Sequence, residues 1–174
     1  MIDLFVEHGA DGIAFGLLTD AGEVDVARCR QIVRQIGVRA AVFHRAFDVT
    51  PDPFCAMVQL IECGIQRVMT SGQAPTAVQG AGLITELIRR ARGRIEVLSA
   101  AGINPSTVIE IVARTGCNQV HASLRGERRD RSVSQRPEIS FGRPLPLPAD
   151  CYEATDATAV KELSAMLRNR SVAP

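Results

Sequence analysis

The chain has 174 residues, a length that suits one domain with a hydrophobic core of its own. Hydrophobic residues make up 46% of it and charged residues 22%, so the composition argues against a disordered or fibrous protein. The formal net charge is +1 and aromatic residues make up 4%, which argues against a nucleic-acid partner and against an anionic membrane surface.

The five cysteines are far apart in the sequence and form no C-x-x-C pair. They are Cys29, Cys55, Cys63, Cys117 and Cys151. Their odd number and wide spacing predict reduced, mostly buried thiols rather than a disulfide framework or a zinc site. No segment approaches the ~20 apolar residues of a membrane span, and the acidic first residues do not resemble a signal peptide. We therefore expect a cytoplasmic protein with no membrane partner.

Short apolar runs alternate with amphipathic helical patterns along the chain. The first residues, from Ile2 to Val6, predict the last turns of a helix that ends near Gly9. Buried strands are expected at 12–18, 40–44, 67–70, 95–99 and 119–122. Helices are expected from Asp25 to Gly37, from Thr50-Pro51 to Gly64, from about Leu83 to Gly93, from Asn104-Pro105 to Gly116, and from about Asp156 onward.

The strand starts recur roughly every 24 to 28 residues, which is about the length of a strand and a crossover helix, so parallel strands are expected. The early strands lack a G-x-G-x-x-G fingerprint, which favours a barrel over a dinucleotide-binding sheet. Five strands and a doubtful one at 151–155 fall short of eight, and a full barrel needs ~250 residues. The predicted fold is an α/β, TIM-type (β/α) barrel, truncated at its N-terminus to about five of eight βα units, in one domain over 1–174.

The segment 125–150 is predicted to be an irregular connector rich in arginine and proline. Its first part, RGERRDRSVSQR, contains five arginines, and four prolines follow between Pro137 and Pro148. A nucleic-acid patch is the alternative for the arginines, but no aromatic residues lie among them. A solvated loop is therefore the expectation.

The stretch AVFHRAFD at 41–48 is the leading candidate for chemistry. Strand alternation predicts that Phe43 faces the helices and His44 the barrel interior, with Arg45 and Asp48 on the following loop. His44 and Asp48 are the candidate catalytic residues, because an imidazole acts as acid or base near neutral pH and a carboxylate can orient it. The alternative is a structural histidine tied to Asp48, with Arg45 bridging strand ends.

Arginine binds a carboxylate or phosphate through two parallel hydrogen bonds. Polar residues at the ends of other strands could join it there, although a plain turn or a structural network explains them equally well. The predicted ligand-binding residues are Arg45, Ser71, Gly72, His121, Ser123 and Arg125.

Several segments resemble the CutC family of copper homeostasis proteins, in the family's own order. They are GADGIAFGLLTDAGEVD at 9–25, VFHRAFD at 42–48, IQRVMTSG at 65–72, GRIEV at 93–97 and YEATDATAVKEL at 152–163. The resemblance implies a TIM-like barrel and a role in copper homeostasis, with copper as the only implied cofactor. The family's opening strands have no counterpart here, and SAAGI at 99–103 replaces a P-G-G-G-I segment whose glycines would let an anion approach the backbone.

The resemblance therefore predicts a cytoplasmic copper homeostasis protein that binds Cu(I), although no convergent soft ligands are evident and the metal ligands are left unassigned. Whether the chain is an enzyme is left open. One alternative is a barrel enzyme or sensor for a small anionic, phosphorylated metabolite, with His44 as acid or base. A second alternative is a non-functional fragment or a misassigned start. An incomplete barrel has unpaired strand edges, which a homo-oligomer would cover.

Overall fold

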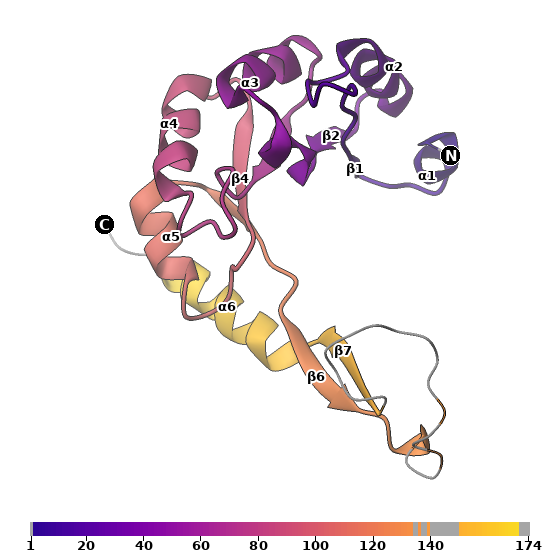
Figure 1. Ribbon diagram of the computed structural model, residues 1–174, viewed down its shortest axis with the longest axis vertical. Coiled ribbons are helices and arrows are strands. Elements are labelled where there is room, and N and C mark those ends of the chain that lie inside the picture. The colour runs from indigo at the N-terminus through magenta and orange to yellow at the C-terminus, as the bar shows by residue number, and fades with distance from the viewer. Residues whose placement is uncertain (1, 134–135, 137–138, 140–149, 171–174) are drawn as a thin grey trace. The chain divides into compact units, whose positions relative to one another are not determined.

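The computed structural model describes residues 2–133, 136, 139 and 150–170. They belong to two compact units, Met1–Ala122 and Ser123–Pro174. The elements of the first unit are α1 (Ile2–Glu7), β1 (Gly12–Phe15), α2 (Val26–Ile36), β2 (Ala40–Phe43), the 3-10 helix η1 (Arg45–Val49), α3 (Pro53–Glu62), β3 (Arg67–Thr70), α4 (Ala81–Ala91), β4 (Glu96–Ala100), α5 (Val108–Thr115) and β5 (Gln119–His121). Figure 1 shows their course along the chain.

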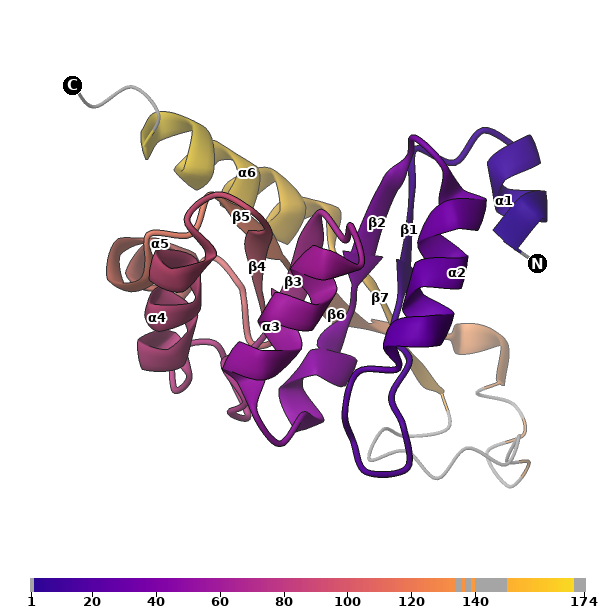
Figure 2. The same cartoon turned by 90° about the horizontal axis from the view of Figure 1, so that it is seen from above.

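The first unit contains a sheet of five parallel strands in the order β1-β2-β3-β4-β5. Helices α2 to α5 lie on the same side of this sheet (Figure 2). This is the expected succession of βα units, and all five predicted strands are present with ends shifted by no more than a few residues. The predicted α/β, TIM-type fold is confirmed, with an open sheet in the part of the chain that the structure describes.

Burial alternates along the central strands, as it does when only one face of a sheet is covered. Phe43, Val68 and Val97 occupy neighbouring positions in the register, and they are at most 6% exposed. Since the helices cover one face, these buried residues face the helices, as predicted for Phe43. Val42, Met69 and Leu98 alternate with them on the opposite face and are only partly buried.

Two helix starts differ from the expectation. Pro51 does not open α3; the side chain of Asp52 instead accepts hydrogen bonds from the backbone N–H groups of Phe54 and Cys55, and Pro53 is the first helical residue. Thr50 is not the N-cap of α3; it is the C-cap of η1, and its hydroxyl donates to the carbonyl of Phe47.

The start of α5 is also later than predicted. Asn104 accepts a hydrogen bond from the backbone N–H of Ser106, two residues on, and so forms an Asx turn before the helix. Thr107 is the residue at the N-cap position. The helix that Asp25 was predicted to cap does begin there, since Asp25 Oδ1 accepts from Arg28 N at 3.0 Å.

The second unit contains β6 (Arg125–Arg129), the 3-10 helix η2 (Arg131–Val133), β7 (Cys151–Thr155) and α6 (Ala157–Arg170). The prediction of an irregular segment from residue 125 onward is therefore wrong for β6 and η2. β6 pairs antiparallel with β7, and the doubtful strand at 151–155 exists but is not part of the parallel sheet. Residues 137–138 and 140–149 of the predicted connector lie outside the described residues.

Ion pairs across the ribbon explain why a polar segment forms a strand. Arg125 Nη1 lies 3.1 Å from Glu153 Oε2, and Arg129 Nε lies 2.7 Å from Asp150 Oδ2. These partners are diagonal or adjacent in the register rather than directly opposite, and Arg125 and Arg129 flank the directly opposed Glu127 and Glu153. The arginines of β6 are thus matched by acidic residues close in space but distant in sequence.

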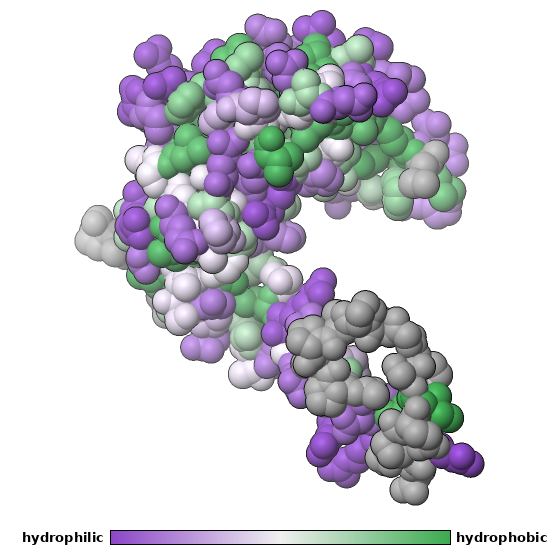
Figure 3. Space-filling model, viewed as in Figure 1, coloured by the Kyte–Doolittle hydropathy of each residue, from purple (hydrophilic) through white to green (hydrophobic). Residues whose placement is uncertain are grey.

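Apolar side chains are also exposed at the N-terminal end of the first unit. Leu4 and Phe5 on α1 are 54% and 50% exposed. Figure 3 shows hydrophobic atoms in green around α1 and the neighbouring strands. Among the described residues no helix has the length and apolar character needed to cross a membrane.

Candidate functional site

The carboxyl ends of β2 and β3 bring together several of the predicted site residues. His44, Arg45 and Asp48 follow β2, and Ser71 and Gly72 follow β3. Because β2 and β3 are parallel neighbours, these two loops meet at the same edge of the sheet.

Asp48 accepts hydrogen bonds from both loops. Its Oδ2 accepts from Arg45 Nε at 2.7 Å, and its two oxygens accept from the backbone N–H of Ser71 at 3.0 and 3.1 Å. Thr70 Oγ1 donates to Oδ1 at 2.5 Å, and Gln73 N approaches the same oxygen at 3.4 Å. The Asp48 side chain is 8% exposed, so this carboxylate joins the two loops from a nearly buried position.

Ser71 links this network to the arginine. Arg45 Nη2 donates to Ser71 Oγ at 3.0 Å. Ser71 Oγ also lies 2.9 Å from Asp48 Oδ2 and 2.6 Å from the Ala74 carbonyl oxygen, and its single proton goes to one of these acceptors at a time. Arg45 is thus held by two protein contacts while 45% of its side chain is exposed.

His44 has a separate environment. Its Nδ1 accepts from the backbone N–H of Ala46 at 3.1 Å, so the neutral ring carries its proton on Nε2. The ring lies against Gly16, where a Cβ atom would come within 3.0 Å of it. The idea that Asp48 ties and orients His44 is wrong, because the oxygens of Asp48 are taken by Arg45, Thr70 and Ser71. A catalytic role for either residue stays a prediction.

Of the other three predicted ligand residues, only His121 belongs to the first unit, and it lies apart from this group. His121 ends β5, three strands away from β2, which corresponds to about 14 Å at the usual strand spacing. Ser123 and Arg125 belong to the second unit, where Arg125 pairs with Glu153. The structure therefore brings together Arg45, Ser71 and Gly72.

Sequence reasoning missed Gln73 and Thr50. Gln73 Nε2 donates to the carbonyl of Thr50 at 2.6 Å, which adds a second link between the two loops. Gln73 has a φ of 54°, a left-handed conformation that is uncommon for residues other than glycine. Neither residue belongs to a recognisable motif, so no signal in the sequence identified this contact.

The loop after β4 contains the segment in which alanines replace the family's glycines. Ala101 has a φ of 78°, in the left-handed region, and its carbonyl accepts from Ala77 N at 3.0 Å. Ser99, fully buried on β4, has a hydroxyl oxygen with no hydrogen-bond partner among the described residues. Ala101 thus has a backbone conformation that suits glycine better than alanine.

Ala101→Gly is expected to stabilise the protein by about 1 kcal/mol, because glycine adopts a positive φ without the clash of a Cβ atom. Gly102→Ala should have the opposite effect, since Gly102 has a φ of 69° and an added Cβ would lie 3.2 Å from Thr76. Urea unfolding of both variants measures the change. A lower midpoint for Ala101→Gly would show that this backbone is not strained.

The thiols do not form a prepared metal site. Cys29, Cys63 and Cys117 are buried, Cys55 is exposed and Cys151 is partly exposed. Burial, and next the neighbouring Cys63, raises the pKa of the Cys29 thiol to about 12, whereas metal ligation requires the thiolate. Within the described ranges no group of three or more His, Cys, Asp or Glu side chains could hold a metal ion.

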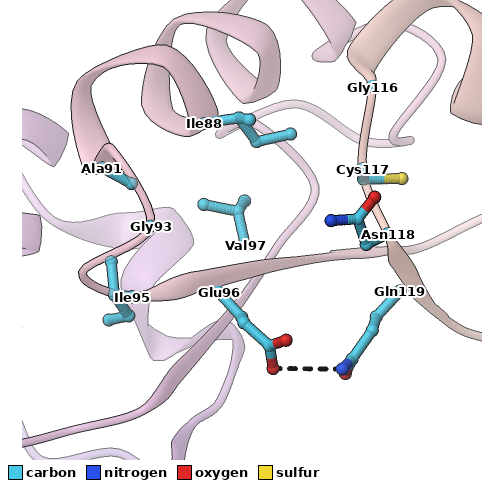
Figure 4. A pocket seen from close by; sticks show the side chains of 10 residues that line it. All are labelled: Ile88, Ala91, Gly93, Ile95, Glu96, Val97, Gly116, Cys117, Asn118 and Gln119. Atoms are coloured by element: carbon cyan, nitrogen blue, oxygen red, sulfur yellow. Dashed lines mark hydrogen bonds between the residues drawn. The ribbon is translucent and has the colours of Figure 1, made fainter.

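A small cavity of about 150 Å³ lies at the opposite edge of the sheet. Its lining residues, shown in Figure 4, are Ile88, Ala91, Gly93, Ile95, Glu96, Val97, Gly116, Cys117, Asn118 and Gln119. Gln119 Nε2 donates to Glu96 Oε2 at 3.0 Å, and most of the lining is apolar. This is the amino-terminal edge of the strands, which in barrels of this type serves stability rather than catalysis.

Comparison with known proteins places the chain in a family. Residues 1–126 match the model of the CutC family. A CutC family protein from Treponema denticola is 43% identical over 150 residues, 86% of this chain and 61% of the relative. The Homo sapiens copper homeostasis protein cutC homolog is 34% identical over 162 residues, 93% of this chain and 60% of the relative.

A solved structure agrees with these matches. The structure of CutC from Streptococcus agalactiae has a TM-score of 0.66 and 28% identity, and the match covers 69% of this chain and 59% of that one. The chain thus spans about three fifths of the length of these relatives. By sequence and by fold, the chain belongs to the CutC family.

Proposed function

We propose that the chain takes part in copper homeostasis, in the cytoplasm. Copper homeostasis is part of the names of the human and mouse relatives, which are both 34% identical to this chain over 93% of it. The cytoplasm is supported by the five free cysteines, since persistent disulfides are typical of oxidising compartments.

The molecular activity that the geometry supports best is the binding of a small anionic ligand at the carboxyl edge of β2 and β3. The observation that carries this proposal is that Asp48 and Ser71 hold the guanidinium of Arg45 while 45% of the Arg45 side chain remains exposed. A pre-positioned guanidinium loses less freedom on binding a phosphate or carboxylate. His44 follows β2 directly and would supply a donor, through Nε2, or an acid or base to the same ligand.

The test is a titration with inorganic phosphate followed by residue-resolved NMR. Saturable shifts of the backbone amide signals of His44, Arg45, Ser71 and Gly72 are the expected result. Arg45→Gln should weaken this binding by about tenfold or more, as loss of a charge-assisted contact predicts. Arg114→Gln is the matched control, because Arg114 is an exposed arginine, 49% accessible and paired with Glu110.

If phosphate shifts these amides equally in Arg45→Gln, the anion does not bind through Arg45 and the proposal is wrong. Because Arg45 also contacts Asp48, the urea midpoint of the variant has to be measured alongside. Arg45→Lys keeps the positive charge without the planar fork, so it separates charge from geometry.

Direct Cu(I) binding is the second candidate, supported by the names of the relatives and by the five free thiols. The described residues contain no group of three or more possible metal ligands, and the exposed thiol of Cys55 is the one most accessible to Cu(I). Competition against a chromophoric Cu(I) chelator decides this point. Retention of Cu(I) that is lost on Cys55→Ser supports it, and transfer of all Cu(I) to the chelator contradicts it.

A further inference from the structure

Four arginines line a hollow of about 520 Å³ where α4 leads into β4. They are Arg89, Arg90, Arg92 and Arg94, and we call them the arginine cluster. Arg89 and Arg90 belong to the last turn of α4, and the chain then enters β4 at its amino end, so the arginines lie at the sheet edge opposite Arg45 and His44. The arginine cluster is therefore separate from the candidate site described above.

The positive charge of the arginine cluster is only partly compensated. Glu86 pairs with two of its members, at 2.6 Å from Arg89 Nη2 and 2.5 Å from Arg90 Nε. Hydrogen bonds from Arg89 and Arg90 lower the pKa of Glu86 to about 2, so its single negative charge is fixed. Among the described residues no other carboxylate pairs with the cluster, which leaves four positive charges against one negative.

Three of the four guanidinium groups are already positioned by the protein. Arg89 donates to both oxygens of Glu86, at 2.6 and 2.7 Å. The guanidinium carbon of Arg90 lies 3.9 Å from the centre of the Phe54 ring. Arg94 donates to the carbonyls of Ala91 and Arg90, each at 3.2 Å. Groups that are held in this way lose less freedom when an anion binds.

Arg92 has the most unusual position of the four. It follows α4 with a φ of 49°, in the left-handed conformation that glycine or asparagine usually adopts at a helix end. Its side chain is exposed and has no ionic or hydrogen-bond partner in the described part of the chain. Arg92 thus adopts a backbone conformation that arginine rarely adopts, and no side-chain contact compensates for it. This indicates a role for the Arg92 side chain itself.

We propose that the arginine cluster binds a small ligand with two or more linked phosphate groups, such as a pyrophosphate or a nucleoside diphosphate. Several guanidinium groups around one hollow match several phosphates. Arg92 can donate two parallel hydrogen bonds to phosphate oxygens, and the other three keep N–H donors that their protein contacts do not use. The volume of the hollow is within the range of small-ligand sites. An extended nucleic acid fits less well, because the nearby aromatic ring, Phe54, already has Arg90 stacked on one of its faces.

Isothermal titration calorimetry of the full chain with pyrophosphate, tripolyphosphate and inorganic phosphate tests this proposal. We expect pyrophosphate to bind at least about tenfold more tightly than phosphate, because it contacts more guanidinium groups. Arg92→Gly should weaken pyrophosphate binding by about tenfold without loss of folding, because glycine suits the backbone at this position. Arg94→Gln should act in the same direction.

The controls separate this site from the carboxyl-edge site. Arg114→Gln removes one charge elsewhere and should leave pyrophosphate binding unchanged. The loss caused by Arg92→Gly should persist in the Arg45→Gln background, where the carboxyl-edge site no longer contributes. Unchanged affinity in Arg92→Gly and Arg94→Gln, or loss only in Arg45→Gln, would overturn the proposal. It would also be overturned if a short single-stranded DNA bound more tightly than tripolyphosphate and lost affinity in the same variants, since the ligand would then be an extended polyanion.

Discussion

Asp48→Ala is expected to lower the free energy of unfolding by about 3 kcal/mol, because it leaves several buried donors without an acceptor. Thr70 and Ser71 are fully buried, and both donate to this carboxylate. Arg45 is 45% exposed, so it can turn to water and contributes less to the loss. Urea unfolding monitored by circular dichroism gives the change as a shift of midpoint.

Asp48→Asn is the more informative variant, because it keeps the shape of the side chain. The amide nitrogen of the asparagine must face groups that are themselves donors, so most of the loss in unfolding free energy should remain. Asp20 is exposed, and Asp20→Asn removes the same charge with an expected effect within about 0.5 kcal/mol. Equal midpoints for Asp48→Asn and the native chain would show that the two loops do not depend on this carboxylate.

The sequence predicted the sheet well because its strands are short apolar runs between turn residues. It placed the start of α3 wrongly because the stretch Thr50-Pro51-Asp52-Pro53 offers two pairs of a capping residue and a proline. Which of the two pairs starts α3 depends on η1, because the Thr50 hydroxyl donates to the carbonyl of Phe47 in η1. Aspartate is the better N-cap of the two, so the ranking of capping residues could have identified Asp52.

The strand β6 was missed for a different reason. It has no apolar alternation, and its partners Asp150 and Glu153 lie more than 20 residues further along the chain. Charge pairing at that distance leaves no local signal in the sequence. A strand that is stabilised by its ion pairs therefore looks like a solvated loop until its partner is known.

The candidate site was predicted in outline, because parallel strands end at one edge of their sheet. That rule alone brings Arg45 and Ser71 together. It does not tell which donors a carboxylate finds, and Asp48 accepts from Arg45 and the second loop rather than from His44. The partner of Asp48 follows from the turn of η1, which reverses the chain between His44 and Thr50.

Gly80→Ala is expected to destabilise the protein by about 3 kcal/mol, because overpacked sites lose this much when their neighbours cannot move. Gly80 has a φ of −86°, which any residue adopts, so only space is at issue. An added Cβ would come within 3.0 Å of the Ser71 carbonyl oxygen and of Gly72, which are backbone atoms. In Gly72→Ala the added Cβ would come within 3.0 Å of the Gly80 backbone, and alanine would also be strained at a φ of 72°.

Gly82→Ala provides the matched control within α4, because no atom lies within 4 Å of the added Cβ. It should raise stability by up to about 1 kcal/mol through helix propensity. Opposite shifts of the urea midpoint in two alanine variants two residues apart would locate the effect in the contact with Ser71. Because Ser71 also bonds to Asp48, the effects of Gly80→Ala and Asp48→Asn should be less than additive in the double variant. Full additivity would mean that the packing of Gly80 and the hydrogen bonds of Asp48 hold the loops independently.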